Sequence, residues 1–297
     1  MSLQLPKRVA TLAAVGAGVL ALGGCSSETR GEWERGAMPD PASVQGERIL
    51  HLWQGAWIAA LAVGILVWGL IFYAVVRFRR RHADEIPVQT RYNLPLEILY
   101  TIAPVIMIIV FFAKTVDTQN FVLDQDRPVD NTIEVVGQQW SWTFNYGIGE
   151  MDAAANDDAT DDQFPYSSYV HDSGTASHVP DLYLPVDRTT RFNLHSPDVI
   201  HNLGVPAFVL KMDVIPGRVN HYSITPTEIG EYTGRCFELC GVYHSRMLFD
   251  VHVVSQDDYD AYIQALQDAG RETDKPLLGG DYVHTQAGLD DNEGEAP

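Results

Sequence analysis

The segment CFELCGVYHSRM at residues 236–247 concentrates side chains that bind soft metals: Cys236, Cys240, His244 and Met247. A thiolate, an imidazole and a weak thioether together suit copper, and blue-copper sites combine two histidines, one cysteine and an axial methionine. The second cysteine is one more than a mononuclear site needs. Two thiolates, each able to bridge, allow two copper ions to share the site.

A second histidine must come from elsewhere in the chain. His201 is the best candidate, because residues 196–201 (SPDVIH) lead out of a predicted strand into an apolar segment that contains proline. His195, His221 and His252 are the alternatives. They lie in strand-like runs, where packing or solvent exposure explains a histidine without a metal.

Other chemistries account for fewer of these residues. Structural zinc sites use cysteine and histidine and have no need of a methionine. A disulfide between Cys236 and Cys240 suits an exterior compartment, but the pair would close a very small loop. A lone Met247 would be core packing, and its spacing from the other three residues favours a ligand.

The elements that must position this site are predicted to be short strands separated by turns, as in a β-sandwich or barrel. The predicted strands are residues 132–136, 140–146, 191–194, 208–210, 218–224, 230–235 and 248–254. Ser255 is the predicted N-cap of a helix that runs to Ala269. Residues 147–180 are rich in Asp, Ala and Ser and predict a solvated acidic insertion.

The start of the chain has the pattern of an exported protein. Residues 1–24 have a basic start and an apolar run, as in a secretory signal peptide, and the ending LGGC resembles a bacterial lipobox. Cys25 is therefore the predicted lipidation site. Residues 25–51 are predicted to form an exterior N-terminal segment.

A membrane hairpin is predicted over residues 52–116. Its first uncharged run, residues 52–76, is long enough to span a bilayer, and the arginines that follow place a loop of residues 77–93 in the cytoplasm. The second run contains Glu97. Ionisable groups at membrane depth are often functional, so Glu97 is a candidate entrance of a proton path; an interfacial carboxylate without a function is the alternative.

Charge divides the chain at the end of this hairpin. Residues 1–116 hold 8 acids and 11 bases, whereas residues 117–297 hold 31 acids and 9 bases, within a net charge of −19. Such a balance argues against a nucleic-acid binder. It predicts an acidic exterior domain at residues 117–270, followed by a flexible acidic tail at residues 271–297. The acidic surface suits a basic partner protein, with Asp198 as one candidate contact, or serves only solubility.

Together these segments resemble cytochrome c oxidase subunit II, the subunit of haem-copper terminal oxidases that carries a dinuclear copper (CuA) centre. The resemblance covers residues 45–265 outside the insertion. The matching pieces are DVIH at 198–201, VP at 205–206, KMDVIPGRVN at 211–220, residues 230–247, the aromatic segment GQQWSWTFNY at 137–146, and EILYTIAP at 97–104. It implies a membrane α-hairpin plus an all-β exterior domain, with two transmembrane helices followed by a cupredoxin-like Greek-key β-barrel.

The resemblance also implies roles for single residues. Two copper ions would be bridged by both cysteines, one completed by His201 and Met247, the other by His244 and the backbone carbonyl of Glu238. The Glu238 carboxylate would help to hold magnesium at the interface with subunit I, since this hard cation prefers oxygen ligands. Trp140 would be the point where electrons arrive, with ordinary aromatic packing as the alternative. Glu97 would open a proton path into subunit I.

The implied function is to accept electrons from cytochrome c and pass them to haem in subunit I, where oxygen is reduced to water with proton pumping. The implied location is a bacterial cell membrane, with a lipid-anchored N-terminus and the C-terminal domain outside. A membrane-anchored copper-delivery or storage protein would not explain Trp140 or Glu97. A quinol-oxidase-type subunit would lack the metal ligands. The chain departs from the family pattern at Asn202, Leu203, Arg235 and Phe237, none of which is an implied ligand.

Overall fold

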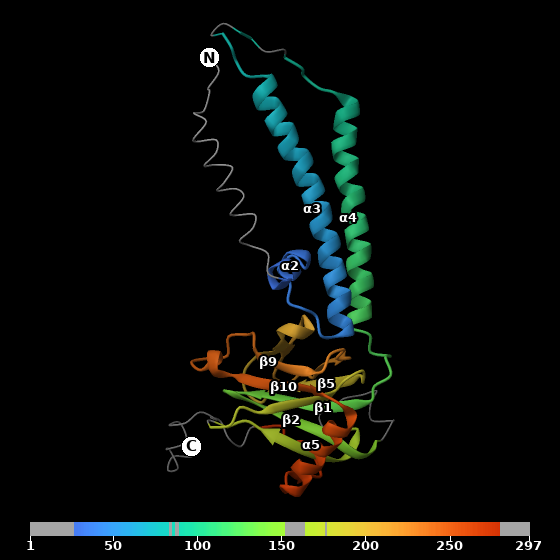
Figure 1. Cartoon of the computed structure of the whole chain (residues 1–297), viewed down its shortest axis with the longest axis vertical. Helices are drawn as coiled ribbons and strands as arrows, with labels where there is room; N and C mark the ends of the chain where they lie inside the picture. Colours follow the sequence, from blue (N-terminus) through green and yellow to red (C-terminus); the bar gives the residue numbers. More distant parts are fainter. Residues whose placement is uncertain (1–26, 83–84, 87–88, 152–163, 176, 280–297) are drawn as a thin grey trace. The chain divides into compact units, whose positions relative to one another are not determined.

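The structure is a computed structural model that describes residues 27–82, 85–86, 89–151, 164–175 and 177–279 (Figure 1). The predicted signal peptide of residues 1–24 and the predicted lipidation site Cys25 lie outside the described residues. The chain forms two compact units. One comprises residues 1–40 and 53–79, and the other comprises residues 41–52 and 80–297.

Among the residues that the structure describes, two helices are long and apolar enough to cross a membrane: α3 (Val44–Arg77) and α4 (Leu94–Val122). Both extend beyond the apolar runs that the sequence predicts. Most of their large apolar side chains are exposed, as a lipid-facing surface requires, and a helix pairs most of its backbone groups within its own segment. The predicted pair of membrane-spanning helices is therefore confirmed.

A short helix, α2 (Ser27–Glu34), precedes α3. The turn that follows it is fastened to α3 by two hydrogen bonds. Trp53 Nε1 donates to the Gly36 carbonyl at 3.0 Å, and Gln54 Nε2 donates to the Glu34 carbonyl at 3.0 Å. The first apolar turns of α3 thereby hold the N-terminal segment.

The described residues after α4 form two β-sheets and one helix near the end of the described chain (Figure 1). The six-stranded sheet has the order β11-β3-β2-β1-β5-β8, with β11 (Glu272–Thr273), β3 (Tyr166–Ser173), β2 (Ser141–Met151), β1 (Asn131–Gln138), β5 (Thr190–His195) and β8 (Asn220–Ile224). The five-stranded sheet has the order β4-β10-β9-β6-β7, with β4 (Asp181–Pro185), β10 (Leu248–Val254), β9 (Gly230–Cys236), β6 (His201–Val205) and β7 (Leu210–Val214). Two short 3₁₀ turns, η1 (Pro206–Phe208) and η2 (His244–Arg246), and helix α5 (Gln256–Asp268) complete the domain. The predicted all-β domain behind a helical hairpin is confirmed.

The hydrophobic core lies between the two sheets. Strand β10 alternates, so that Phe249, Val251 and Val253 are completely buried while the residues between them are not. The Phe249 ring meets Trp142 of β2 edge to face at 5.6 Å and Phe144 of the same strand at 5.2 Å. Such aromatic contacts between facing strands fix how the two sheets pack.

Four strands, β3, β4, β6 and β11, were not predicted, and Phe208 lies in η1 instead of a strand. β11 lies within the predicted flexible tail of residues 271–297 and pairs with β3. All five residues of β6 are buried, so the strand lacks the alternation that marks a half-exposed strand. Within the predicted insertion, β2 continues to Met151 and β3 begins at Tyr166, which leaves residues 152–163 outside the described part.

The segment of residues 41–46, which leads into α3, is built into the β domain. Its backbone pairs with residues 207–227: Ala42 N–H donates to the Ala207 carbonyl at 2.7 Å, and Val44 N–H donates to the Thr225 carbonyl at 3.1 Å. The Gln45 side chain accepts from the Thr225 N–H at 3.1 Å. Ala42, Ser43 and Gln45 are buried, so this segment is part of the domain's core.

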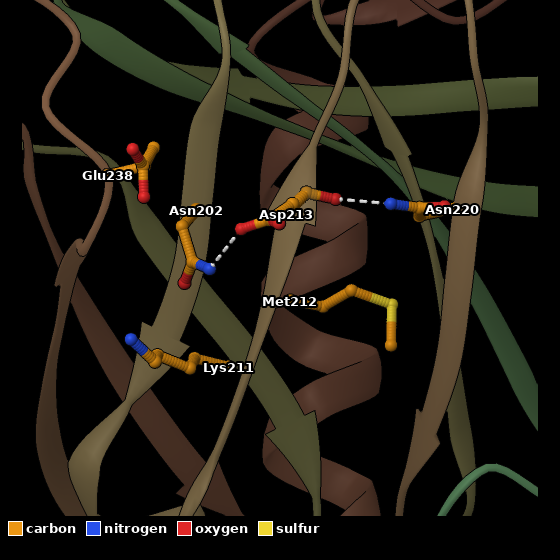
Figure 2. A pocket seen from close by; sticks show the side chains of 6 residues that line it. All are labelled: Asn202, Lys211, Met212, Asp213, Asn220 and Glu238. Carbon is orange, nitrogen blue, oxygen red and sulfur yellow. Dashed lines mark hydrogen bonds between the residues drawn. The ribbon is translucent and has the colours of Figure 1, made fainter.

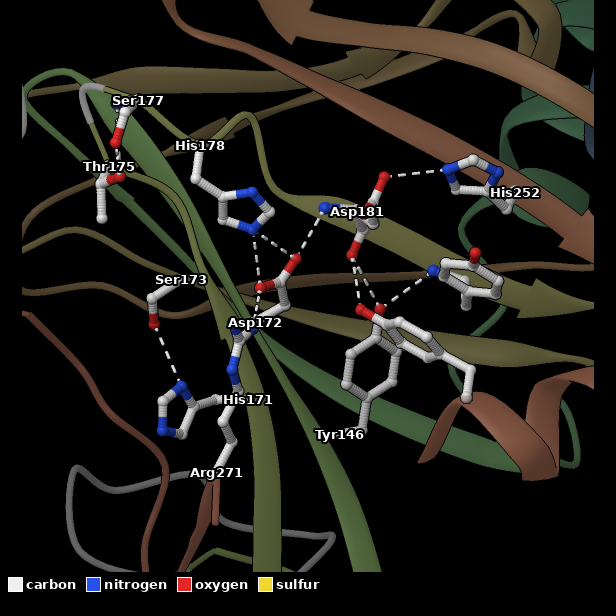
Figure 3. Close-up of polar contacts among 12 residues, drawn as sticks. Tyr146, His171, Asp172, Ser173, Thr175, Ser177, His178, Asp181, His252 and Arg271 are labelled. Carbon is white, nitrogen blue, oxygen red and sulfur yellow. Dashed lines mark hydrogen bonds and ion pairs between the residues drawn. The ribbon is translucent and has the colours of Figure 1, made fainter. Parts of the chain in front are cut away.

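A buried carboxylate fastens the end of β3 to the chain beyond α5. Asp172 is 2% exposed and accepts from His178 Nε2 at 2.9 Å, from Arg271 Nη1 at 2.5 Å and from the Asp181 N–H at 2.9 Å (Figure 3). Three donors offset the cost of burying the charge. Arg271 precedes β11, so this network helps to bring the C-terminal residues onto the six-stranded sheet.

Replacing Phe249 with alanine should lower the free energy of unfolding of the β domain by about 3–5 kcal/mol, because the substitution leaves a cavity between the sheets. The thermal midpoint of the detergent-solubilised chain measures the loss. Leu248→Ala is the matched control, since Leu248 lies on the opposite face of β10 and is 38% exposed. An equal loss in both variants would contradict this account of the core.

Candidate metal centre

The antiparallel pair β9–β10 brings both ends of the metal-binding segment together. Cys236 is the last residue of β9, His244 begins η2, and Met247 directly precedes β10. The Cys236 N–H donates to the Met247 carbonyl at 3.0 Å and closes the loop at its base. The spacing from Cys236 to Met247 in the sequence is therefore the length of the connection between β9 and β10.

His201 reaches the same place from the neighbouring strand. It begins β6, which pairs with β9 so that Leu203 lies opposite Cys236. His201 is completely buried, and its Nδ1 lies 4.0 Å from Cys236 Sγ. Ligand atoms of His201, Cys236 and Cys240 all lie within 4.8 Å of one another.

The other donor atoms surround the two sulfurs, which are 3.9 Å apart. His244 Nδ1 lies 3.5 Å from Cys240 Sγ, and Met247 Sδ lies 3.8 Å from the same sulfur. The carbonyl oxygen of Glu238 lies 3.2 Å from Cys236 Sγ. Every residue that the sequence analysis named as a copper ligand is thus present in one cluster.

The alternative histidines are engaged elsewhere. His195 Nε2 contacts the buried carboxylate of Glu134 at 2.7 Å, and His252 Nε2 contacts Asp181 at 2.9 Å. His221, like these two, does not belong to the group of ligand atoms around the sulfurs. The donor set of two thiolates, two imidazoles and a thioether fits copper, which prefers soft and borderline ligands.

The two thiols ionise at very different pH. A hydrogen bond with Cys240 lowers the pKa of Cys236 to about 4, and His201 adds to this effect against the cost of burial. The pKa of Cys240 is raised well above its ordinary value, because its proton is shared with the Cys236 thiolate and because it is buried. One negative charge forms readily at this site, and the second requires a cation.

Asp198 connects the histidine to the neighbouring hairpin. Its Oδ1 accepts from His201 Nε2 at 2.9 Å, and its Oδ2 accepts from the Gln139 N–H at 2.7 Å. Burial opposes ionisation of Asp198, but the hydrogen bonds from His201 and two backbone N–H groups outweigh it and lower the pKa of the carboxyl. The bond to Nε2 leaves Nδ1 of the ring directed towards Cys236.

The tip of the β1–β2 hairpin lies against the cysteine loop. Gln139 Nε2 and Trp140 Nε1 both donate to the Cys240 carbonyl, at 2.7 and 3.2 Å. The Trp140 ring is 8% exposed and meets Tyr243 edge to face at 5.1 Å. Gly241 has a φ of +128°, and a Cβ there would come within 2.9 Å of the Trp140 ring, so this approach requires glycine.

A second indole supports the cluster from the core. Trp142 Nε1 donates a long bond of 3.4 Å to the Met247 carbonyl, and its ring lies edge to face with His201 at 6.2 Å. A Cβ on Gly137 would come within 2.9 Å of Trp142 and 3.3 Å of His201. Sequence reasoning placed Trp142 in an aromatic segment but assigned it no contact with the site.

The Glu238 side chain lines an open cleft of about 470 Å³ beside the cluster, formed by Asn202, Lys211, Met212, Asp213, Asn220 and Glu238 (Figure 2). Within it, Asn202 Nδ2 donates to Asp213 Oδ1 at 2.6 Å. Of the four departures from the family pattern, Asn202 lines this cleft. Phe237 lies under the cations of Lys211 and Arg235, at 5.5 and 5.0 Å from its ring centre.

Glu97 lies in the first turn of α4 and takes part in its N-terminal cap. Glu97 Oε1 accepts from the Asn93 N–H at 3.0 Å, while Asn93 Oδ1 accepts from the Leu96 N–H at 3.3 Å. This reciprocal pair satisfies two helix-terminal donors. Sequence reasoning missed it, although an asparagine before a Leu-Pro start is an N-cap signal.

The fold and this cluster define a class: a membrane-bound protein that carries a soft-metal electron-transfer site in a two-sheet domain. The family model for the periplasmic domain of cytochrome c oxidase subunit II matches residues 131–254, and the model for its transmembrane domain matches residues 31–115. The chain is 42% identical, over 90% of its length and 89% of the relative, to a probable cytochrome c oxidase subunit 2 of Streptomyces avermitilis. It is 34% identical, over 87% of its length and 81% of the relative, to cytochrome c oxidase subunit 2 of Mycobacterium tuberculosis.

A solved structure of the periplasmic domain of subunit II (CoxB) of Bradyrhizobium japonicum aligns with a TM-score of 0.39, at 24% identity over 48% of this chain and 97% of the other. The assignment rests on the family models and the curated relatives. The chain belongs to the cytochrome c oxidase subunit II family. It is thus a membrane subunit of a haem-copper terminal oxidase with an outer, copper-binding domain.

Asp198→Ala should weaken copper binding by roughly 10–100-fold, because His201 loses the carboxylate that orients its ring. Competition with a copper chelator measures the affinity of the detergent-solubilised chain. Asp198→Asn keeps an oxygen acceptor and should retain most of the affinity. Unchanged affinity in the alanine variant would show that His201 needs no orienting partner.

Proposed function

We propose that the cluster holds two copper ions that share an electron. Cys236 and Cys240 would bridge both ions, with His201 and Met247 on one side and His244 and the Glu238 carbonyl on the other. The convergence of four further donors on two sulfurs 3.9 Å apart is the observation that carries the proposal. When bound, the copper pair would supply one-electron chemistry with little change in geometry.

Electrons would arrive from cytochrome c through Trp140. Its indole N–H donates to the carbonyl of Cys240, so a short bonded route leads from the ring to a bridging sulfur. The exposed side chains of Leu239 and Val242, 77% and 82% accessible, lie in the same loop. They would give a partner protein an apolar contact beside Trp140.

Electrons would leave towards haem in subunit I, on the side of Glu238. This residue contributes its carbonyl to the cluster and its carboxylate to the adjoining cleft. Magnesium shared with subunit I would suit that carboxylate, since Mg²⁺ prefers oxygen ligands and keeps several of its waters. One residue would thus contact both metal sites.

Glu97 would mark the entrance of a proton path into subunit I, at the start of α4. Its membrane position supports this role, because placing a carboxylate in a membrane segment costs free energy, and such residues therefore often have a function. The bond to Asn93 shows a structural duty as well. Mutations of Glu97 and Asn93 distinguish the proton-path role from the capping role.

The chain would be anchored twice in a bacterial cell membrane. Helices α3 and α4 span the bilayer, and a lipid on Cys25 would hold the mature N-terminus at the outer surface. Residues 1–24 would be removed as a signal peptide. Intact mass of the purified chain, with and without lipase treatment, tests this anchor.

Copper analysis of the full chain in detergent should give two copper ions per chain, with the hyperfine pattern of one electron shared between two nuclei. Met247→Leu should change this spectrum and leave the fold intact, because the axial thioether tunes the site. Met212→Leu is the matched control, since Met212 lines the adjoining cleft instead of the cluster.

One copper ion per chain, or zinc, would contradict a dinuclear centre. A copper-delivery protein would bind copper but would release it quickly when an acceptor protein is added to the purified chain. It would also leave the rate of oxygen reduction unchanged when Trp140 is replaced by phenylalanine. Those results would favour the alternative function.

Glu97→Gln should lower oxygen reduction by the assembled oxidase severalfold while the copper spectrum stays unchanged. Asn93→Ala is the control, because it removes the other bond of the capping pair, from the Leu96 N–H to Asn93 Oδ1, at a cost of about 1 kcal/mol and keeps the carboxylate. Oxygen consumption in proteoliposomes measures both. Equal losses in the two variants would assign Glu97 to helix capping alone.

A further inference from the structure

The chain beyond α5 crosses the outer face of the six-stranded sheet. Arg271 is held by Asp172, and β11 then pairs with β3. Residues 276–279, here called the C-terminal strap, continue past β2 towards β1. Residue 279 is the last residue that the structure describes.

Asn145 of β2 holds the strap by its backbone. This side chain is completely buried. Its Nδ2 donates to the Leu277 carbonyl at 3.1 Å, and its Oδ1 accepts from the Leu277 N–H at 2.8 Å. Both functional groups of a buried amide are thus used on one residue of the strap, as in a strand pairing.

The strap ends in close contact with two segments of the metal centre. Gly279 has a φ of +79°, and a Cβ there would collide with Gln138 Oε1 and come within 3.0 Å of Pro197 Cγ. Gln138 is the last residue of β1, at the base of the hairpin that carries Trp140. Pro197 lies in the loop that leads to His201.

The next residues along these two segments hold the copper ligands. Gln139 donates to the Cys240 carbonyl, and Asp198 accepts from His201. Gln139 and Asp198 are also bonded to each other at 2.7 Å. The strap therefore lies across the outside of the joint between the Trp140 hairpin and the His201 loop.

We infer that the C-terminal strap is a positioning element that holds the Trp140 hairpin against the His201 loop, with Asn145 as its anchoring residue. The inference rests on the proposed role of Trp140 and the copper pair. In this arrangement the strap fixes the distance between the indole and the bridging sulfur. It also keeps Asp198 in place for His201.

Two truncations of the chain in the assembled oxidase test this role. Ending the chain after Lys275 removes the strap, whereas ending it after Gly279 removes only the residues that follow. The first should slow reduction of the copper centre by a soluble cytochrome c by about fivefold. It should also speed copper release to a chelator by roughly fivefold, since partners beyond the ligands control affinity. The second should match the intact chain.

A pair of point variants covers the case in which the shorter chain fails to assemble. Gly279→Ala and Gly217→Ala impose the same strain, because φ is +79° and +70°. Only Gly279 meets Gln138 and Pro197, and Gly217 has open space around it. Gly279→Ala should shift the copper spectrum and slow reduction, and Gly217→Ala should leave both unchanged.

Each remaining outcome overturns the inference. Equal effects of the two truncations would assign the function to residues 280–297. Equal effects of the two glycine variants would show that backbone strain alone, without the contacts of Gly279, causes the change. Slower reduction by cytochrome c with an unchanged spectrum and unchanged copper release in every variant would point to donor docking. Absence of copper from the intact chain would instead refute the proposed function.

Discussion

Two buried cysteine sulfurs 3.9 Å apart impose the constraint on which the rest of this domain depends. One thiolate forms easily, and its charge suppresses ionisation of the other. A pair of thiolates at this distance is stable only with positive charge between or beside them. The domain therefore has to keep the sulfurs close and still admit a cation, which demands that the loop be held from several sides.

The support comes from three different parts of the sequence. Strand pairing closes the loop at Cys236 and Met247, the hairpin tip holds the Cys240 carbonyl, and Asp198 orients His201. Each of these contacts is weak by itself. Together they fix the ligands before the metal arrives, so that oxidation and reduction meet a site whose geometry is already set.

Much of this site could be predicted from the sequence, because the cysteines, His244 and Met247 share one strand connection whose spacing is visible. The helical hairpin could be predicted from its apolar runs. Strand β6 could not, since it is buried throughout and shows no alternation. Gln139 and Asn145 were also missed, because an amide side chain gives no signal until its backbone partner, far away in the sequence, is known.

The departures from the family pattern have a related explanation. Phe237 and Arg235 were visible as unusual residues beside Cys236, but Lys211, whose cation also lies over the Phe237 ring, comes from β7. The contacts of Phe237 therefore depend on the order of β9, β6 and β7 in the sheet. Judged one at a time, none of the departures has an evident reason.

The segment of residues 41–46 has a consequence for how the chain is threaded through the bilayer. Its backbone and side chains bond to residues 207–227, and such bonds can form only if both stretches reach the same side of the membrane. The chain between them must then cross an even number of times, which agrees with α3 and α4. A molecule with only one crossing would leave Ala42, Ser43 and Gln45 without their partners, so the copper domain can close only when both helices have crossed the membrane.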